Sequence, residues 1–475
     1  MSRARRHAAL VAMLALAGLY ACGEPAPRLP NLVFITLDTT RADHLGLYGY
    51  PRDTSPHLDA FAEESIVFER ALAPIATTLP THLSLFTATH PLEHGVIANA
   101  QDDGGRPPIA PGLRLFAEVA REAGYQTAGF VSSAPLRSDS GVEAGFETYT
   151  QPPDKRLARP GHVTTEEALA WLAATPRGPY LLWVHLFDAH WPFTPPEHTA
   201  RLFGTDAIAL AWLAERQVPE LSERIGIGPE NSRKVLNLYD AELRFQDEQV
   251  GRLLHALASR RDWPHTAVIV VGDHGEGLSQ HGHAAHGGTW DEQLRVPLLL
   301  RVPDQEPRRE TELVSVVDIL PTLLGLLKVE ELDLILAQAS GRDRLRVRSD
   351  RQVLSQDSGR FRADGGYRYA LTTPRWKYIR VEREQGPSQE LLFDLDADPF
   401  ELQDLAAKRP KVLAEMRGRL SEDLAGRLER GRELRPDELP EAPPDPGLLR
   451  QLQELGYLID DAESPAAQDG SDTGR

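Results

Sequence analysis

The sequence contains one cysteine, Cys22, in 475 residues. A single cysteine excludes an intrachain disulfide framework, a multi-cysteine zinc site and a cysteine-ligated iron–sulfur cluster. Lysine is also scarce, because only 6 of the 52 basic residues are lysine and arginine supplies the rest. The 70 acidic residues outnumber the basic ones and give a formal net charge of −18. This balance disfavours non-specific binding to nucleic acid or to anionic lipid surfaces.

The N-terminal apolar stretch, residues 8–21, is shorter than the ~20 residues that a helix needs to cross a membrane. It follows a basic start and ends at Cys22, an arrangement typical of a secretory signal. Leu19-Tyr20-Ala21-Cys22 resembles a bacterial lipoprotein processing site, so we expect a signal peptide over residues 1–21 and a lipid on Cys22. The chain would then be anchored to a membrane of the bacterial envelope, facing the periplasm or the cell surface. An ordinary cleaved signal with an incidental cysteine is the alternative.

The body of the chain has an ordinary globular composition, with 41% hydrophobic and 26% charged residues. From residue 30, short apolar runs alternate with stretches of helical periodicity, which predicts an α/β fold with a mostly parallel central sheet flanked by helices. We expect strands at residues 31–37, 126–132, 180–187, 267–271 and 296–302, and helices at residues 57–69, 113–123, 165–174 and 232–260.

Arginine and aspartate displace most apolar residues at positions 338–357, which indicates a change of domain. Beyond it, residues 369–381 and 391–395 predict an antiparallel pair and residues 410–428 a helix, together a smaller C-terminal α+β subdomain. The expected organisation is a linker, a large first domain, the subdomain and an acidic, mostly loose tail, at residues 22–29, 30–337, 338–430 and 431–475.

A carboxylate, Asp38, follows the first expected strand directly. Ligands of open α/β sheets bind beyond the carboxyl ends of the strands, and a carboxylate there is a natural ligand for a divalent cation. A cap on a turn or helix is the alternative role for Asp38.

A second strand end carries Asp273 and His274, in the stretch Gly272-Asp273-His274-Gly275-Glu276-Gly277. The flanking glycines permit the sharp turn that lets both side chains reach one ion. His281, His283 and His286 follow, so a His-rich surface loop with loose metal affinity is the alternative.

A hydroxyl group, that of Thr78, stands at an expected helix start in the stretch Thr77-Thr78-Leu79-Pro80-Thr81-His82. A helix N-terminus can receive an anionic substrate, and metal coordination can activate a hydroxyl there as a nucleophile. His82, one turn further, could donate to a phosphoryl or sulfuryl oxygen. The structural alternative is a threonine cap followed by a first-turn proline.

Together these motifs resemble the sulfatase family of the alkaline phosphatase superfamily, from about residue 31 to residue 405. The matching stretches occur in family order at residues 31–43, 78–95, 184–193, 272–288, 295–302 and 317–324, with 375–379 and 392–395 in the C-terminal part. The resemblance implies a metal-dependent hydrolase of sulfate or phosphate esters, acting on small-molecule, glycan or lipid esters. The less regular segment at residues 197–230 is expected to cap the site or to be an insertion.

The resemblance also implies roles for particular residues. Asp38, Asp273 and His274, completed by the Thr78 hydroxyl, are similar to the family's metal ligands; Thr39 stands where many members have a further aspartate. A histidine beside carboxylates suits Mn²⁺ or Zn²⁺ as well as Ca²⁺.

Three further histidines match substrate-handling positions of the family. His82 stands where sulfatases usually have an arginine, and His286 where many have a lysine or histidine that binds substrate. His190 matches the histidine that assists the leaving group. Packing against Trp191 is the alternative for His190, and a plain surface role is the alternative for His286.

Thr78 departs from the sulfatase pattern, because it replaces the cysteine or serine that becomes formylglycine. It resembles the nucleophile of superfamily members such as nucleotide pyrophosphatase/phosphodiesterases. A threonine alkoxide that attacks phosphorus leaves a phospho-threonine that water can open, whereas a sulfated threonine lacks the aldehyde's elimination route. We therefore expect phosphorus esters to be preferred.

Two alternatives come from other classes. One is a phosphotransferase, similar to phosphoethanolamine transferases, that passes a group from Thr78 to an acceptor in the envelope. The other is a non-catalytic binding protein that retains the fold.

Overall fold

The computed structural model describes residues 29–101, 105–153, 156–175, 178–204, 216, 229–347, 351–357, 366–383 and 387–435. The expectations for the signal segment and Cys22 therefore concern residues outside this part of the chain, as do most of the expected acidic tail and most of the segment at 197–230. The start of the expected tail, residues 431–434, is not loose but forms the end of the last helix. No helix among the described residues is both long enough and apolar enough to span a membrane.

The main sheet has nine strands within the described residues, in the order β4-β3-β5-β1-β6-β8-β2-β7 with β9 beside β2. The block from β4 to β6 is parallel, and β8 joins it antiparallel. This arrangement confirms the expected mostly parallel sheet. The strands are β1 (Asn31–Leu37), β2 (Ile66–Leu72), β3 (Gln126–Val131), β4 (Thr148–Thr150), β5 (Tyr180–Leu186), β6 (Thr266–Gly272), β7 (Arg295–Val296), β8 (Leu298–Arg301) and β9 (Arg308–Ser315).

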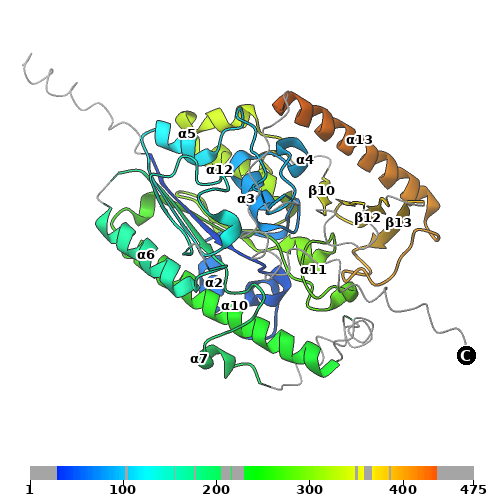
Figure 1. The fold of residues 1–475 in the computed structure, drawn as a ribbon, viewed down its shortest axis with the longest axis horizontal. Helices are drawn as coiled ribbons and strands as arrows, with labels where there is room; N and C mark the ends of the chain where they lie inside the picture. The colour runs from blue at the N-terminus through cyan, green and yellow to red at the C-terminus, as the bar shows by residue number, and fades with distance from the viewer. Residues whose placement is uncertain are drawn as a thin grey trace, which may run out of the picture.

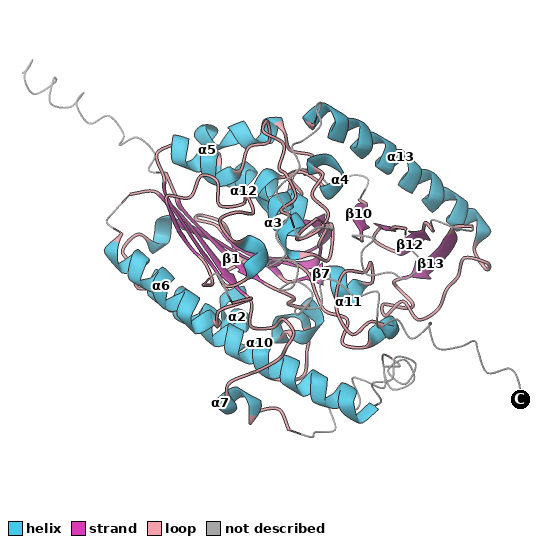
Figure 2. Ribbon diagram, viewed as in Figure 1, coloured by secondary structure: helices cyan, strands magenta, loops and turns pink. Residues whose placement is uncertain are grey.

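Helices cover both faces of this sheet (Figures 1 and 2). One face packs against α2 (Pro56–Ala62), α6 (Gly161–Ala174) and α10 (Pro229–Ala258), and the other against α3 (Thr78–Thr87), α5 (Phe116–Glu122) and α12 (Ile319–Leu327). All seven residues of β1 are buried, because alternate side chains of a strand enter opposite layers and both layers are apolar. Short helices complete this part: α4 (Pro91–His94), α7 (Glu197–Ala200) and α11 (Asp291–Leu294).

A second, antiparallel sheet of four strands follows among the described residues. The helix α13 (Pro410–Leu434) packs on it through Met416, Leu420 and Leu424. This small sheet and its helix confirm the expected α+β part. The strands are β10 (Val353–Gln356), β11 (Arg368–Thr372), β12 (Trp376–Val381) and β13 (Gln389–Asp394).

Three sequence expectations need correction. The helix predicted over residues 57–69 ends at Ala62, and the β-branched and aromatic run from Ile66 begins β2. The strand predicted over 296–302 is divided into β7 and β8 at Pro297, which has no N–H for the ladder. The strand predicted over 369–381 is a hairpin, β11 and β12, whose turn closes with a 2.8 Å hydrogen bond from Thr373 N to Trp376 O.

Candidate active site

The two expected metal-ligating carboxylates lie side by side at the carboxyl end of the sheet. Strands β1 and β6 pair in parallel with Leu37 opposite Gly272, so Asp38 and Asp273 leave the sheet at the same level. Asp273 N donates to Leu37 O at 3.2 Å, which holds the two turns together. Both carboxylates are buried. A Cβ at Gly272 would lie 2.9 Å from Thr40 O, so the close approach of the two turns requires glycine at this position.

His274 joins them with its ring orientation fixed. Its Nδ1 donates to Gly275 O at 3.0 Å, which leaves the Nε2 lone pair available to a ligand. Asp273 Oδ1 accepts hydrogen bonds from the backbone N–H groups of Thr39 and His274, at 3.1 and 2.6 Å. Ligand atoms of Asp38, Asp273 and His274 all lie within 4.8 Å of one another.

This ligand set fits a divalent cation. Asp38 Oδ1 and Asp273 Oδ2 are buried and accept no hydrogen bond from any described residue. Burial raises the pKa of Asp38 well above its usual value, and burial together with the charge of Asp38 raises the pKa of Asp273. Two adjacent buried carboxylates repel each other, and a cation between them removes that cost.

Thr78 is the first residue of α3 and lies directly against these groups. Its Oγ1 is 3.4 Å from Asp38 Oδ2 and 3.4 Å from His274 Nε2. The neighbouring Thr81 is occupied elsewhere, because its hydroxyl donates to Ile75 O at 2.7 Å. The structure thus brings the expected nucleophile to the expected ligands at a helix N-terminus.

The structure places His82 beneath the site rather than in it. Its Nδ1 lies 2.8 Å from Thr78 O, and its Nε2 lies 3.0 Å from Thr36 Oγ1. Trp183 Nε1 donates to the same Thr36 oxygen at 2.9 Å, so the Thr36 hydroxyl proton is free to bond His82 Nε2. Burial and the nearby His185 lower the pKa of His82 well below its usual value. A neutral His82 with both nitrogens engaged does not offer the expected hydrogen bond to a substrate oxygen.

His190 and His286 meet on the other side of His274. Their Nε2 atoms are 3.2 Å apart, and the His286 ring centroid lies 4.4 Å from that of His274. His190 Nδ1 faces Trp191 O at 2.5 Å, and His286 Nδ1 faces Ala76 O at 3.1 Å. Burial lowers the pKa of both rings, that of His286 to about 4. His286 therefore lies against His274, and His190 lies against His286.

The His-rich stretch does not act as one cluster. His281 points away from the site, stacks on Trp290 with ring centroids 3.9 Å apart, and pairs with Glu292 at 2.8 Å. Burial lowers the pKa of His281, but the charge of Glu292 more than offsets this and raises it to about 9. His281 therefore ties the loop down instead of binding a ligand.

Sequence reasoning missed His185, on β5. Its Nε2 lies 3.2 Å from Asp38 Oδ2, and its ring is fully buried. The available signal was a histidine near the carboxyl end of an otherwise apolar strand. Because β5 pairs with β1 and places His185 opposite Thr36, that histidine comes close to Asp38 at the end of β1. Its partner could be found only once the strand order was known.

The mostly parallel sheet flanked by helices has the fold expected of the alkaline phosphatase superfamily. The Sulfatase family model matches residues 30–329, and the chain belongs to that family. It is accordingly an enzyme, a hydrolase acting on ester bonds.

Several characterised proteins resemble the chain over most of its length. An ulvan-active sulfatase of Formosa agariphila is 26% identical over 430 residues, covering 81% of this chain and 78% of the relative. A Δ4,5-hexuronate-2-O-sulfatase of Bacteroides thetaiotaomicron is 23% identical, covering 89% and 95%. The crystal structure of a phosphonate monoester hydrolase of Agrobacterium radiobacter shares the fold, with a TM-score of 0.65, 21% identity, and coverage of 84% and 96%.

Proposed function

We propose that this enzyme is a metal-dependent hydrolase of sulfate or phosphate esters in which Thr78 is the nucleophile, with phosphorus esters preferred. The observation that carries the proposal is the position of Thr78 Oγ1, 3.4 Å from both Asp38 Oδ2 and His274 Nε2 at the first residue of α3. A hydroxyl in that place can attack a substrate whose anionic oxygens face the helix N-terminus.

In this mechanism the Thr78 hydroxyl gives its proton to water, and Thr78 Oγ forms a bond to phosphorus while the bond to the leaving oxygen breaks. A divalent cation held by Asp38, Asp273 and His274 would lower the pKa of the Thr78 hydroxyl and balance the charge of the substrate. A proton held between the Nε2 atoms of His190 and His286, which lie 3.2 Å apart, would pass from His190 to the leaving oxygen. Water then attacks the phospho-threonine, breaks its bond to Thr78 Oγ and releases the second product.

The preference for phosphorus rests on the chemistry of threonine. Thr78 cannot become formylglycine, so a sulfated intermediate would have to be hydrolysed directly. The relatives are sulfatases, so sulfated glycans are the competing substrate class. The phosphonate monoester hydrolase with the same fold favours phosphorus chemistry as a use for this scaffold.

A panel of aryl sulfate, phosphate monoester, phosphate diester and phosphonate monoester substrates tests the proposal, each assayed with Ca²⁺, Mn²⁺ and Zn²⁺. We expect turnover of phosphorus esters and a covalent adduct, trapped with a slow substrate, on the peptide that contains Thr78. A clear preference for aryl sulfates would contradict the substrate proposal, and an adduct elsewhere would contradict the nucleophile. An added acceptor alcohol separates hydrolysis from transfer.

We also propose that Cys22 carries a lipid that holds the enzyme at the bacterial envelope. Support comes from the basic start, the apolar run and the position of the single cysteine. Cys22→Ser should release the enzyme from the membrane fraction in the absence of detergent.

A further inference from the structure

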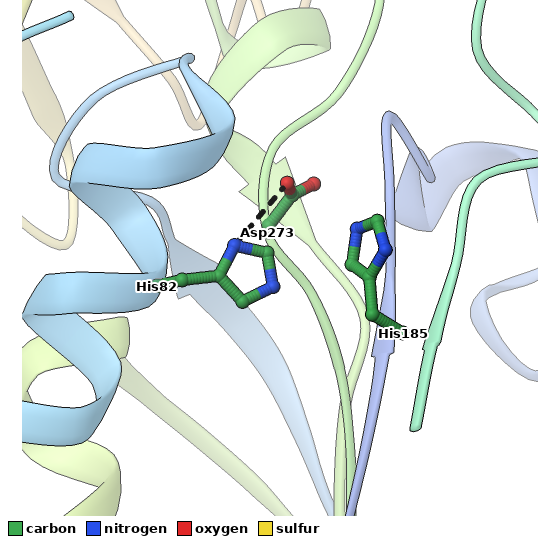
Figure 3. A group of neighbouring side chains, drawn as sticks. All are labelled: His82, His185 and Asp273. Atoms are coloured by element: carbon green, nitrogen blue, oxygen red, sulfur yellow. Dashed lines mark ion pairs between the residues drawn. The ribbon is translucent and has the colours of Figure 1, made fainter. Parts of the chain in front are cut away.

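A second set of buried side chains lies beside the proposed ligands. Potential ligand atoms of His82, His185 and Asp273 also lie within 4.8 Å of one another, and all three residues are buried. Figure 3 shows the two imidazoles on either side of the Asp273 carboxylate, with His82 coming from α3. Such a group could bind a second cation, or it could hold in place the ligands of the cation proposed at Asp38, Asp273 and His274. The hydrogen bonds of the two histidines distinguish these roles.

His82 has no nitrogen to offer to a cation. Its Nδ1 faces Thr78 O at 2.8 Å, and only a protonated nitrogen can bond a carbonyl oxygen. Its Nε2 is 3.0 Å from Thr36 Oγ1, and the distance from His82 Nδ1 to Asp273 Oδ2 is 3.8 Å, longer than a hydrogen bond. His82 therefore fixes the first turn of α3, which carries Thr78.

His185 is held so that it donates to a carboxylate. The backbone N–H of Ser132 points at His185 Nδ1 from 3.4 Å, so this nitrogen accepts and the proton resides on Nε2. Nε2 then donates to Asp38 Oδ2 at 3.2 Å. Ser132 is itself held by a 2.6 Å hydrogen bond between its hydroxyl and that of Thr164. The backbone of β3 thus sets the tautomer of a histidine on β5.

We propose that His185 is the positioning residue for Asp38, and that His82 and His185 support a single cation site instead of forming a second one with Asp273. This inference rests on the proposed cation at Asp38, Asp273 and His274. With Oδ2 held by His185, Asp38 presents Oδ1 to the cation in one orientation. Hydrogen bonds to ligating carboxylates typically contribute 10–100-fold to metal affinity.

The test measures Mn²⁺ binding to the full chain after chelation, by calorimetry and by metal content. Wild type should bind one Mn²⁺ per chain. His185→Leu, which removes the donor, should weaken Mn²⁺ binding by about 10–100-fold. His185→Gln, whose side-chain N–H can replace Nε2, should recover most of that loss. At saturating Mn²⁺ the kcat of both variants should return to near the wild-type value, because the role of His185 is exerted through metal binding.

His90→Leu is the matched control, because His90 is equally buried but bonds Leu354 O in another part of the molecule. It should leave the Mn²⁺ dissociation constant unchanged. Two Mn²⁺ ions per chain, or a folded His185→Leu variant that binds Mn²⁺ as tightly as wild type, would overturn this supporting role while leaving the proposed function intact. A wild-type chain that binds no divalent cation would overturn both.

Discussion

Thr77, Thr78 and Thr81 carry hydroxyl groups close together at the start of α3. The Thr78 hydroxyl lies 3.4 Å from both Asp38 Oδ2 and His274 Nε2. Thr78→Ala should reduce turnover by several orders of magnitude, because the covalent route is lost. Thr78→Ser keeps an attacking oxygen and should retain measurable activity, reduced because the methyl group that restricts the rotamer of threonine is gone. Initial rates at saturating metal provide the measurement.

Thr81→Ala is the control for this prediction. Its hydroxyl donates to Ile75 O, so its loss should lower the free energy of unfolding by about 1 kcal/mol and leave kcat within a few-fold. An active Thr78→Ala enzyme, with Thr81→Ala inactive, would show that the nucleophile has been assigned to the wrong residue.

His82 and His185 show which features of the site could not be predicted from the sequence. The sequence pattern identified the carboxylates, His274 and Thr78, because each follows a strand end or opens a helix. The role of His82 depends on Thr36 and Trp183, which are distant in sequence and meet only when β1 and β5 pair. Tautomers set by such contacts cannot be read from spacing.

At the scale of the elements, neighbouring backbone atoms constrain the turn after β6 tightly. Gly275 N donates to Gln293 O at 2.8 Å, and a Cβ on Gly275 would lie 2.1 Å from Glu292 O. Gly275→Ala must therefore push this turn away from α11 and move His274, whose ring bonds Gly275 O. We expect at least tenfold weaker Mn²⁺ binding and a loss of about 1–3 kcal/mol in the free energy of unfolding.

Gly112→Ala controls for the effect of adding a methyl group. Gly112 is exposed and no atom lies within 4 Å of its added Cβ, so binding and stability should stay near wild type. Unchanged Mn²⁺ affinity in a folded Gly275→Ala protein would contradict the constraint described for the turn.

In the long helix α13, two glycines have room for a side chain, unlike Gly275. Gly418 and Gly426 lie on its exposed side, with no neighbouring atom within 4 Å of an added Cβ. Alanine at each position should raise the free energy of unfolding by about 0.5–1 kcal/mol, because glycine gives up more conformational freedom in a helix. Denaturant midpoints of the single and double variants check this, and a destabilised double variant would be the contrary result.

Element boundaries were the least predictable part of the fold. Buried parallel strands are nearly continuous apolar runs, and this pattern located β1, β3, β5 and β6 to within one residue at either end. The segment at residues 57–69 has the apolar spacing of a helix, yet its last residues, from Ile66, form β2 in the sheet. Such competition is decided by tertiary pairing and leaves no local signal.

At the scale of the molecule, a buried network of charges joins the site loop to the second sheet. Lys377 on β12 contacts Asp291 at 2.8 Å and Glu401 at 2.6 Å. His281 adds its pair with Glu292 and a 3.2 Å contact with Glu401 O. The loop that carries His274 and His286 is therefore supported by residues some hundred positions further along the chain.

This network makes stability depend on pH on the alkaline side. The pKa of His281 is about 9 in the folded protein and about 6.5 in an unfolded chain. Its stabilising contribution, up to about 3 kcal/mol, is fully present below pH ~6.5 and is lost as the pH rises through about 9. Urea unfolding at pH 6.5 and 9.5 should show this loss.

His281→Phe keeps a ring on Trp290 but cannot titrate. It should be less stable than wild type at pH 6.5, because Glu292 loses its partner, and its stability should change less than that of wild type between pH 6.5 and 9.5. Equal pH dependence in the two proteins would remove His281 from this role.

The pairing of β1 with β5 and β6 has a consequence for how the chain is made. The strand that ends in Asp38 leaves the ribosome early, but its partners lie at Tyr180–Leu186 and Thr266–Gly272. Until residue 272 has been synthesised, which is more than half of the polypeptide, this buried strand lacks at least one of its two neighbours and one edge is exposed. Contacts this distant in sequence make folding slow, so the nascent chain should depend on chaperones until β6 emerges.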